Sequence, residues 1–220
     1  YESIVMVIDC TGHGVAGAFL TMLVKAVERQ ILSEILTQNT KISTANILKK
    51  FTTSMQYLLK QNNEKTDVNL GFDGMVLYIN KKENEVKFSS SEVPLFYVDK
   101  NMDINKIKAD RSIMSVRNRN GDYNFSEHTI KLEGNMKFYL TTDGFIDQNG
   151  GDKGFPFGKN RFSQIIENTK HLSPSRQEKQ FKSELSAYQG NEERNDDITL
   201  VCFEIDESFP IENISNGNEI

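Results

Sequence analysis

The sequence predicts an α+β fold in which helices pack on the faces of mostly antiparallel sheets. Two stretches near the N-terminus repeat their apolar residues with the helical period, whereas apolar residues from Leu70 to Thr141 alternate or form short runs typical of strands. The 220 residues are 37% hydrophobic, so the chain can fill one sizeable core without disulfide or metal staples. Strands that are segregated from helices along the chain favour this class.

The chain begins with a strand and two helices. Residues 4–8 form a continuous apolar run, which is typical of a buried strand. A second helix is predicted over 43–62, with Ser43 or Thr44 as its N-cap. The first helix is predicted over 15–38 because apolar residues recur there every four positions, at Phe19, Leu23, Val27, Ile31 and Ile35.

The rest of the chain reads as a meander followed by short helices. Hairpin turns are predicted at 81–84 and 133–135. The strands are predicted over 75–79, 85–89, 95–98, 104–109, 129–132 and 137–141, then helices over 162–169 and 174–188 and a last strand over 198–205. Residues 207–220 are polar and without period, so we expect one domain over 1–206 and a polar C-terminal tail.

Composition excludes several classes of partner. The net charge is -5 and no run of Lys or Arg occurs, which argues against nucleic acid. No segment approaches the ~20 consecutive apolar residues of a membrane span, so we expect no membrane contact by this segment. Cys10 and Cys202 lie in apolar strand-like runs and form no Cys-x-x-Cys pair, which predicts reduced thiols and a cytoplasmic domain.

The first residue, Tyr1, opens directly on a buried-strand pattern, without an initiator Met or a signal peptide. We therefore expect an N-terminally truncated fragment, with strands of the same fold preceding it.

Aspartates stand at the ends of three predicted strands. Asp9 follows the first strand, Asp143 follows residues 137–142, and the pair Asp196 and Asp197 precedes the last strand. If these ends converge, the carboxylates cannot all stay ionised without a compensating cation. Hard oxygen ligands suit Mg²⁺ or Mn²⁺, and no His/Cys set has zinc spacing. Each Asp alone would be read as a turn cap, but together they favour a metal site.

The loop after the first strand also matches the Gly-x-Gly-x-x-Gly pattern of dinucleotide-binding folds, through Gly12, Gly14 and Gly17. That interpretation fails on context, because a second helix follows where the pattern requires a strand. Asp9 would also point a negative charge at the pyrophosphate. Gly12 and Gly14 more simply allow a tight turn from strand into helix.

Three motifs together resemble those of the metal-dependent PPM (type 2C) protein serine/threonine phosphatases. They are the segments 9–19 (DCTGHGVAGAF), 141–145 (TTDGF) and 195–200 (NDDITL). The chain is most similar to the bacterial SpoIIE/RsbU-like branch, and segment 148–158 (QNGGDKGFPFG) resembles SiaA-type phosphatase domains. The resemblance spans residues 4 to 203 and implies a PPM-type β-sandwich of mostly antiparallel sheets flanked by α-helices.

The resemblance implies a role for each matching residue. Asp9 corresponds to the carboxylate that bridges two Mn²⁺ or Mg²⁺ ions, and Cys10 lends its main-chain carbonyl. Asp143 and Asp196 correspond to further metal ligands, while Asp197 falls where relatives carry Asn or Asp. The catalytic residues Asp9, Asp143 and Asp196 would act through metal-bound water.

Two departures from the family pattern stand out. The family's first metal aspartate lies on a strand before Asp9, which has no counterpart in this sequence. The general-acid His of eukaryotic relatives corresponds by offset to Thr11, so His13 is predicted to cap or pack instead.

The resemblance also implies a biological setting. It implies hydrolysis of phosphoserine or phosphothreonine on a STAS-type (anti-anti-sigma) regulatory protein in bacterial signalling, by a two-metal-activated water. It further implies a homodimer formed through the first helix, and fits the cytoplasmic output domain of a larger, membrane-anchored sensor. The alternatives are a non-catalytic PPM-fold binding module and a small-molecule two-metal phosphohydrolase. Glycine-rich residues 149–158 are predicted to be a mobile flap beside the site, or else an ordinary surface loop.

Overall fold

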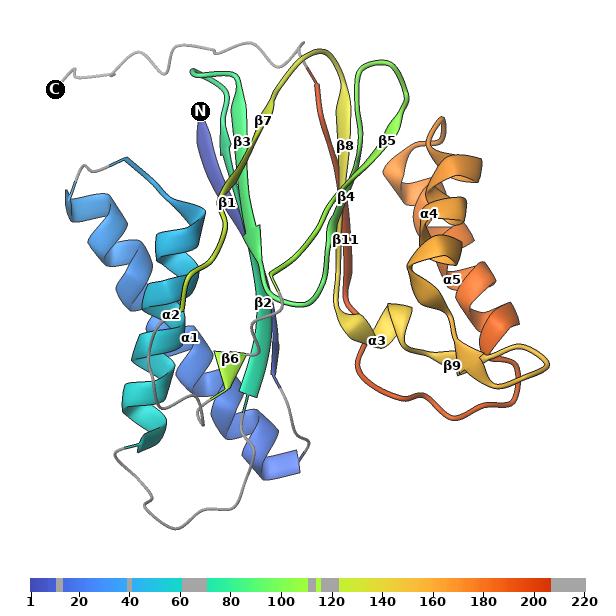
Figure 1. The fold of residues 1–220 in the computed structure, drawn as a ribbon, viewed down its shortest axis with the longest axis horizontal. Helices are drawn as coiled ribbons and strands as arrows, with labels where there is room; N and C mark the ends of the chain where they lie inside the picture. Colours follow the sequence, from blue (N-terminus) through green and yellow to red (C-terminus); the bar gives the residue numbers. More distant parts are fainter. Residues whose placement is uncertain (11–13, 39–40, 61–70, 111–113, 116–122, 207–220) are drawn as a thin grey trace, which may run out of the picture.

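The computed structural model describes residues 1–10, 14–38, 41–60, 71–110, 114–115 and 123–206. The predictions for Thr11, His13, residues 61–62 and the tail 207–220 therefore lie outside the described residues. In the described part, two antiparallel sheets stack face to face, with a pair of helices on each outer face (Figure 1). This four-layer α+β arrangement confirms the predicted fold class.

The first sheet has the strand order β1-β2-β3-β7, with the short β6 also paired to β2. Its strands are β1 (Glu2–Cys10), β2 (Gly71–Asn80), β3 (Glu85–Ser90), β6 (Met114–Ser115) and β7 (His128–Lys131). The second sheet has the order β11-β8-β4-β5 and consists of β4 (Leu95–Val98), β5 (Ile104–Ile107), β8 (Met136–Thr141) and β11 (Leu200–Ile205). The predicted hairpin turn at 81–84 is confirmed, since it joins the paired strands β2 and β3. The prediction of a hairpin at 133–135 is wrong, because this bend leads from β7 in the first sheet to β8 in the second.

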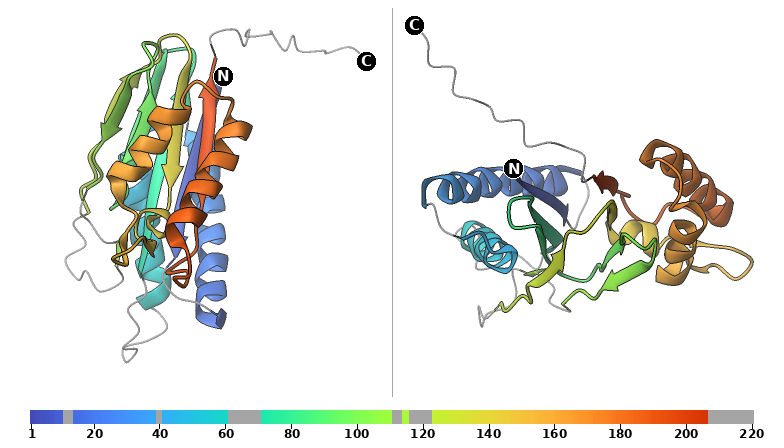
Figure 2. Two further views of the ribbon diagram at one scale, coloured as in Figure 1. Left: turned by 90° about the vertical axis from the view of Figure 1, so that its right-hand side faces the viewer. Right: turned by 90° about the horizontal axis from the view of Figure 1, so that it is seen from above.

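Helices α1 (Gly14–Gln38) and α2 (Thr44–Lys60) cover the first sheet, whereas α4 (Gly158–Thr169) and α5 (Pro174–Gln189) cover the second. Viewed along the layers, the two helix pairs lie on opposite sides of the sandwich (Figure 2). Sequence patterns missed four short elements, β6, α3 (Asp143–Ile146), β9 (Asn149–Gly150) and β10 (Phe155–Pro156), because they are too short to establish a period.

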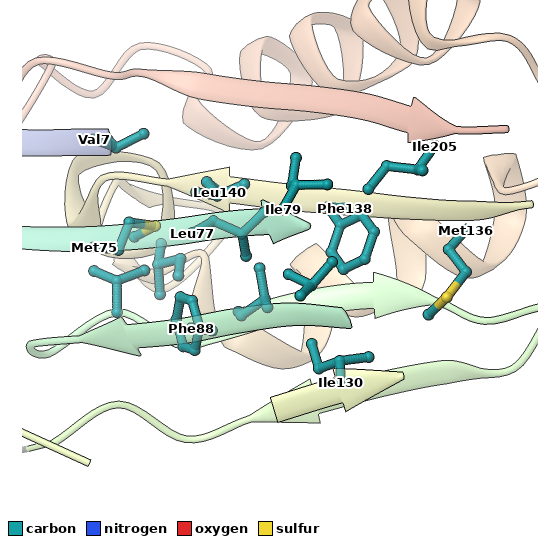
Figure 3. Close-up of a cluster of buried hydrophobic side chains, with 14 residues drawn as sticks. Val7, Met75, Leu77, Ile79, Phe88, Ile130, Met136, Phe138, Leu140 and Ile205 are labelled. Atoms are coloured by element: carbon teal, nitrogen blue, oxygen red, sulfur yellow. The ribbon is translucent and has the colours of Figure 1, made fainter. Parts of the chain in front are cut away.

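The strands face two different apolar layers because successive side chains alternate between the faces of a sheet. On β8, Phe138 and Leu140 point between the sheets, while Tyr139 packs beneath α4 and α5. Figure 3 shows the layer between the sheets, which is formed by Val7, Met75, Leu77, Ile79, Val86, Phe88, Val93, Leu95, Ile130, Met136, Phe138, Leu140, Ile146 and Ile205. This continuous core fixes the two sheets against each other.

The first helix buries only part of its predicted apolar stripe. Leu20, Val27 and Ile31 are buried against α2 and the sheet, as the period predicts. Phe19 was also predicted to belong to the stripe, yet it is 48% exposed, and Leu36, next to Ile35 of the stripe, is 83% exposed. The stripe is wider than the surface that α1 can present to the sheet, so part of it faces outward.

The start of α2 is held by a buried polar network. Glu127 accepts hydrogen bonds from the Thr44 backbone N–H (2.6 Å) and the Thr44 hydroxyl (3.2 Å). The Lys87 ammonium, which is only 5% exposed, lies 3.9 Å from the same carboxylate and donates to the Ile42 carbonyl at 3.1 Å. Burial raises the pKa of Glu127, but bonds from Ser43 and Thr44 and the charge of Lys87 outweigh it, so the pKa is lowered.

We expect Glu127→Gln to destabilise the protein by about 1–3 kcal/mol at neutral pH, because a charge-assisted cap is lost beside a buried lysine. A lowered folded-state pKa contributes stability above the unfolded pKa, and that contribution is lost as the pH falls through the folded value. Urea unfolding at several pH values should therefore show that the difference in free energy of unfolding between the wild type and Glu127→Gln decreases in acid. An advantage that stays constant with pH would contradict this account.

Candidate functional site

Aspartates from both sheets meet at one end of the sandwich. Asp9 lies next to the C-terminal end of β1, Asp143 begins α3 directly after β8, and Asp196 lies in the loop that leads into β11. Because β1, β8 and β11 all have their ends here, at the lower edge in Figure 1, residues far apart in sequence become neighbours. A cavity of about 740 Å³ opens at this edge and is lined by Asp9, Cys10, Thr142, Arg194, Asn195, Asp196 and Asp197, with Gly14, Gly17, Ala18 and Thr21 of α1 on one wall.

The surroundings of Asp9 change the pKa of its carboxyl group. Burial, followed by the charges of Asp143, Asp196 and Asp73, raises the pKa of Asp9 to about 7. The Asp9 Oδ2 atom is buried and has no hydrogen-bond partner in the part of the chain that the structure describes. Buried carboxylate oxygens usually have partners, so this one is a ready ligand atom for a cation.

Asp73 is a residue that the sequence reasoning missed. It lies directly across from Asp9 in the β1–β2 register, and its carboxylate accepts a hydrogen bond from the Ser91 hydroxyl at 2.9 Å. Burial is the main cause that raises the pKa of Asp73 to about 6. The hydrogen bond from Ser91 lowers this pKa, whereas the charges of Glu92 and Asp143 raise it further. An acidic residue inside the apolar run 71–79 was the available signal, but strand patterns do not reveal which residue faces Asp9.

The loop that carries Asp196 is fastened to the segment that carries Asp143. The Thr142 hydroxyl donates to the Asp197 carbonyl at 3.2 Å and accepts from the Thr199 N–H at 3.0 Å. The fully buried Gln148 donates to the Glu193 carbonyl at 2.9 Å and accepts from the Asn195 N–H at 3.2 Å. These bonds hold the Asp196 loop against the segment that carries Asp143.

Cys10 and Asp197 take different positions around the cavity. Cys10 lines it, and burial, aided by the charge of Asp9, raises the pKa of its thiol, so the thiol remains protonated at neutral pH. The Asp197 N–H donates to Asp196 Oδ1 at 2.7 Å, and its carbonyl is used by Thr142. The main chain of Asp197 thus forms hydrogen bonds with Asp196 and Thr142, whereas its side chain is exposed on the cavity wall.

The donor set fits a hard divalent cation, since it consists of carboxylates and includes a buried Asp9 oxygen without a partner among the described residues. The pKa values of Asp9 and Asp73 are also raised. Among the residues that the structure describes, no three His, Cys, Asp or Glu side chains already surround a single point. Asp9, Asp196 and Asp197 line the cavity directly.

The glycine-rich segment 149–158, predicted to be a mobile flap or a surface loop, packs against α5. It forms the β9–β10 hairpin, and the Tyr188 hydroxyl donates to the Phe155 carbonyl at 2.9 Å. The Arg161 guanidinium stacks 4.6 Å from the Tyr188 ring and donates to the Phe157 carbonyl at 2.8 Å. A Cβ at Gly150 would overlap the Tyr188 carbonyl, so the hairpin lies tightly against α5.

Gly144, in the Asp-Gly motif, has no room for a side chain. A Cβ there would overlap the Asp197 carbonyl oxygen and lie 3.3 Å from the Asp196 Cβ. We expect Gly144→Ala to push the Asp196 loop away from Asp143 and to lower phosphatase turnover by about a hundredfold, the scale associated with misplacement by roughly 1 Å. Steady-state kinetics of the purified variant would measure this.

The matched control is Gly190→Ala, because Gly190 has open space around its missing Cβ and a positive φ of 56°. We expect that variant to lose about 1 kcal/mol of stability from backbone strain while keeping its turnover. Equal activity losses in the two variants would show that close packing against Asp197 is unimportant.

Comparisons with known proteins agree with this geometry. The sequence model of the family "Stage II sporulation protein E (SpoIIE)" matches residues 2–206. The SiaA-PP2C domain of Pseudomonas aeruginosa superposes with a TM-score of 0.77 and 28% identity, covering 92% of this chain and 76% of that one. None of the curated protein sequences matches the chain significantly.

Two more distant structures share the fold. The phosphatase domain of SpoIIE from Bacillus subtilis has a TM-score of 0.61 at 14% identity, covering 96% of this chain and 82% of that one. The catalytic domain of the phosphatase PstP, solved with two manganese ions, has a TM-score of 0.62 at 11% identity, covering 93% and 91%. No helix in the described part of the chain is both long and apolar enough to cross a membrane. With its fold, its acidic cavity and the family match over almost its whole length, the chain belongs to the SpoIIE family of metal-dependent, PP2C-type serine/threonine phosphatase domains.

Proposed function

We propose that this domain hydrolyses phosphoserine or phosphothreonine on a regulatory protein, at the cavity between α1 and the Asp196 loop. The observation that supports this most directly is the buried, partnerless Oδ2 of Asp9 among further carboxylates. Such a concentration of negative charge is costly without bound cations. With cations it becomes a site for a dianionic phosphoryl group.

Asp9, Asp143 and Asp196 are the proposed metal ligands, with the Cys10 carbonyl, and Asp197 as a further one. Asp73 faces the same group and is added to this set by its position opposite Asp9. Related folds have been solved with manganese (PstP) and with magnesium (RsbX), which supports Mn²⁺ or Mg²⁺ here. When bound, such ions would supply Lewis acidity and a nucleophilic water at neutral pH.

The chain's own residues would orient the reaction. Thr142 and Gln148 hold the Asp196 loop in place, and the small residues Gly14, Gly17 and Ala18 leave one wall of the cavity open to a substrate. Because Asp9 is drawn toward its protonated form without a cation, it would release that proton when ions bind. We therefore expect cation binding to strengthen as the pH rises through about 7.

The proposal is tested by Mn²⁺ titration calorimetry together with turnover assays on phosphoserine peptides, nucleotides and sugar phosphates. Mn²⁺ binding with preferential peptide turnover would support the proposal. Binding without turnover would point to a regulatory module, and preferential turnover of nucleotides to a small-molecule phosphohydrolase.

The setting of the domain is also a proposal. We place residues 1–206 as one catalytic domain in the cytoplasm, acting on a STAS-type phosphoprotein. Homodimerisation through α1 is supported by the exposed side chains of Val15, Phe19 and Met22 on that helix. Sedimentation analysis of the protein and of Met22→Glu would test it, since a charge in an apolar interface should favour monomers.

A further inference from the structure

A positively charged side chain lines the acidic cavity. Of the described residues that line it, Arg194 is the single Lys, Arg or His. Arg194 lies in the loop just before Asn195 and Asp196, so it stands beside the proposed metal ligands. The positive charge of Arg194 at this place would attract an anion that enters the cavity.

The Arg194 guanidinium forms no salt bridge with an Asp or Glu side chain among the described residues. Its hydrogen bond is to the Gln189 side chain, at the long distance of 3.4 Å. Glu192, Glu193 and Asp196 are close in sequence, yet Arg194 forms no ion pair with any acid in the described part of the chain. Its hydrogen-bonding fork therefore remains available to a ligand.

The backbone on both sides of Arg194 is fixed. Gln148 bonds to the Glu193 carbonyl and to the Asn195 N–H, and the Asn195 side chain donates to the Asp147 carbonyl at 2.7 Å. Arg194 also borders a second cavity of about 700 Å³ beside α5, so it stands on the ridge between the two. A held backbone with an exposed side chain is a suitable base for recognising an incoming group.

We propose that Arg194 binds the phosphoryl oxyanion of the substrate at the mouth of the catalytic cavity. This inference rests on the proposed function. Guanidinium presents paired N–H donors that match two phosphoryl oxygens, which makes it selective for phosphate over a single negative charge. It would hold substrate and product phosphate without acting as a metal ligand.

The test measures the affinity for inorganic phosphate, by calorimetry with Mn²⁺ present, in wild type, Arg194→Ala and Arg194→Lys. Arg176→Ala is the matched control, because Arg176 is exposed on α5 and lines neither cavity. We expect Arg194→Ala to weaken phosphate binding about tenfold, Arg194→Lys to lie between, and the control to be unchanged. The KM for a phosphoserine peptide should rise by a similar factor, with kcat changed little.

The outcomes separate this inference from the proposed function. Phosphate binding that depends on Arg194 without any peptide turnover would support the inference while the proposed phosphatase activity failed. Turnover in the wild type with unchanged phosphate affinity in Arg194→Ala would overturn the inference alone. An equal loss of Mn²⁺ affinity in that variant would also overturn it, because Arg194 would then act on the structure of the metal site. An effect confined to peptides with acidic flanking residues would assign Arg194 to those residues instead.

Discussion

Asp9→Asn should abolish phosphatase turnover, with a loss of about a thousandfold or more. Asp9 interacts with Asp143, Asp196 and Asp73, and its Oδ2 is a buried oxygen without a partner among the described residues. Loss of a shared ligand would remove several kcal/mol of transition-state stabilisation, and each ~1.4 kcal/mol is a factor of ten in rate. Single-turnover kinetics on a phosphoserine peptide would measure the effect. Asp103→Asn is the control, since Asp103 is exposed in the β4–β5 turn and outside the cavity.

The same variant should be more stable than the wild type when metal is absent. The folded-state pKa of Asp9 is raised from 3.8 to about 7, so the folded state holds this proton more tightly than the unfolded state does. Wild-type stability therefore falls as the pH rises from about 4 to about 7, at a rate of at most ~1.4 kcal/mol per pH unit. Because Asp9 is only half-buried, solvent screening makes the actual fall smaller, and an Asn side chain does not carry this penalty.

Thermal unfolding of both proteins between pH 4 and pH 8, with EDTA or with Mn²⁺, would show this difference. In EDTA, we expect the Asp9→Asn variant to unfold at a higher temperature than the wild type only above about pH 4. Mn²⁺ should raise the unfolding temperature of the wild type but not that of the variant. A wild type that remains the more stable protein in EDTA at pH 8 would refute the idea that Asp9 is held at an electrostatic cost.

Phe145→Ala should lower the free energy of unfolding more than Glu127→Gln or Gly190→Ala. Phe145 is 2% exposed, and its ring makes edge contacts with Phe157, Phe162 and Phe181 at centroid distances of 5.4, 5.2 and 5.8 Å. Removing a buried ring from a packed core costs about 3–5 kcal/mol. In a domain of this size, that corresponds to a fall of roughly 6–20 °C in Tm.

Phe155→Ala is the matched control, because Phe155 is the same residue type at 61% exposure in the β9–β10 hairpin. We expect that variant to change the free energy of unfolding by less than about 0.5 kcal/mol. Differential scanning calorimetry would compare the two. Similar losses would mean that the aromatic cluster behind α3 does not anchor the fold. Because α3 begins at Asp143, Phe145→Ala should also reduce metal affinity.

Much of the fold could be predicted from the sequence because its signals are local. The four-residue period of α1, the short apolar run of β8 and the turn residues at 81–84 each depend on near neighbours, and the helix, the strand and the turn are each confirmed. The aspartates at strand ends were found in the same way, since a carboxylate that interrupts an apolar run is visible in the sequence. The family resemblance on three motifs is confirmed by the match over residues 2–206.

Only the tertiary structure decided which groups meet. Asp73 faces Asp9 because the β1–β2 register places them opposite each other, and Arg194 faces the cavity because Gln148 holds its loop. The exposure of Phe19 and Leu36 likewise depends on how much of α1 the sheet can cover. The physical reason is the same throughout: periodicity fixes the direction of a side chain within its own element, whereas register, packing and long-range hydrogen bonds determine its neighbours.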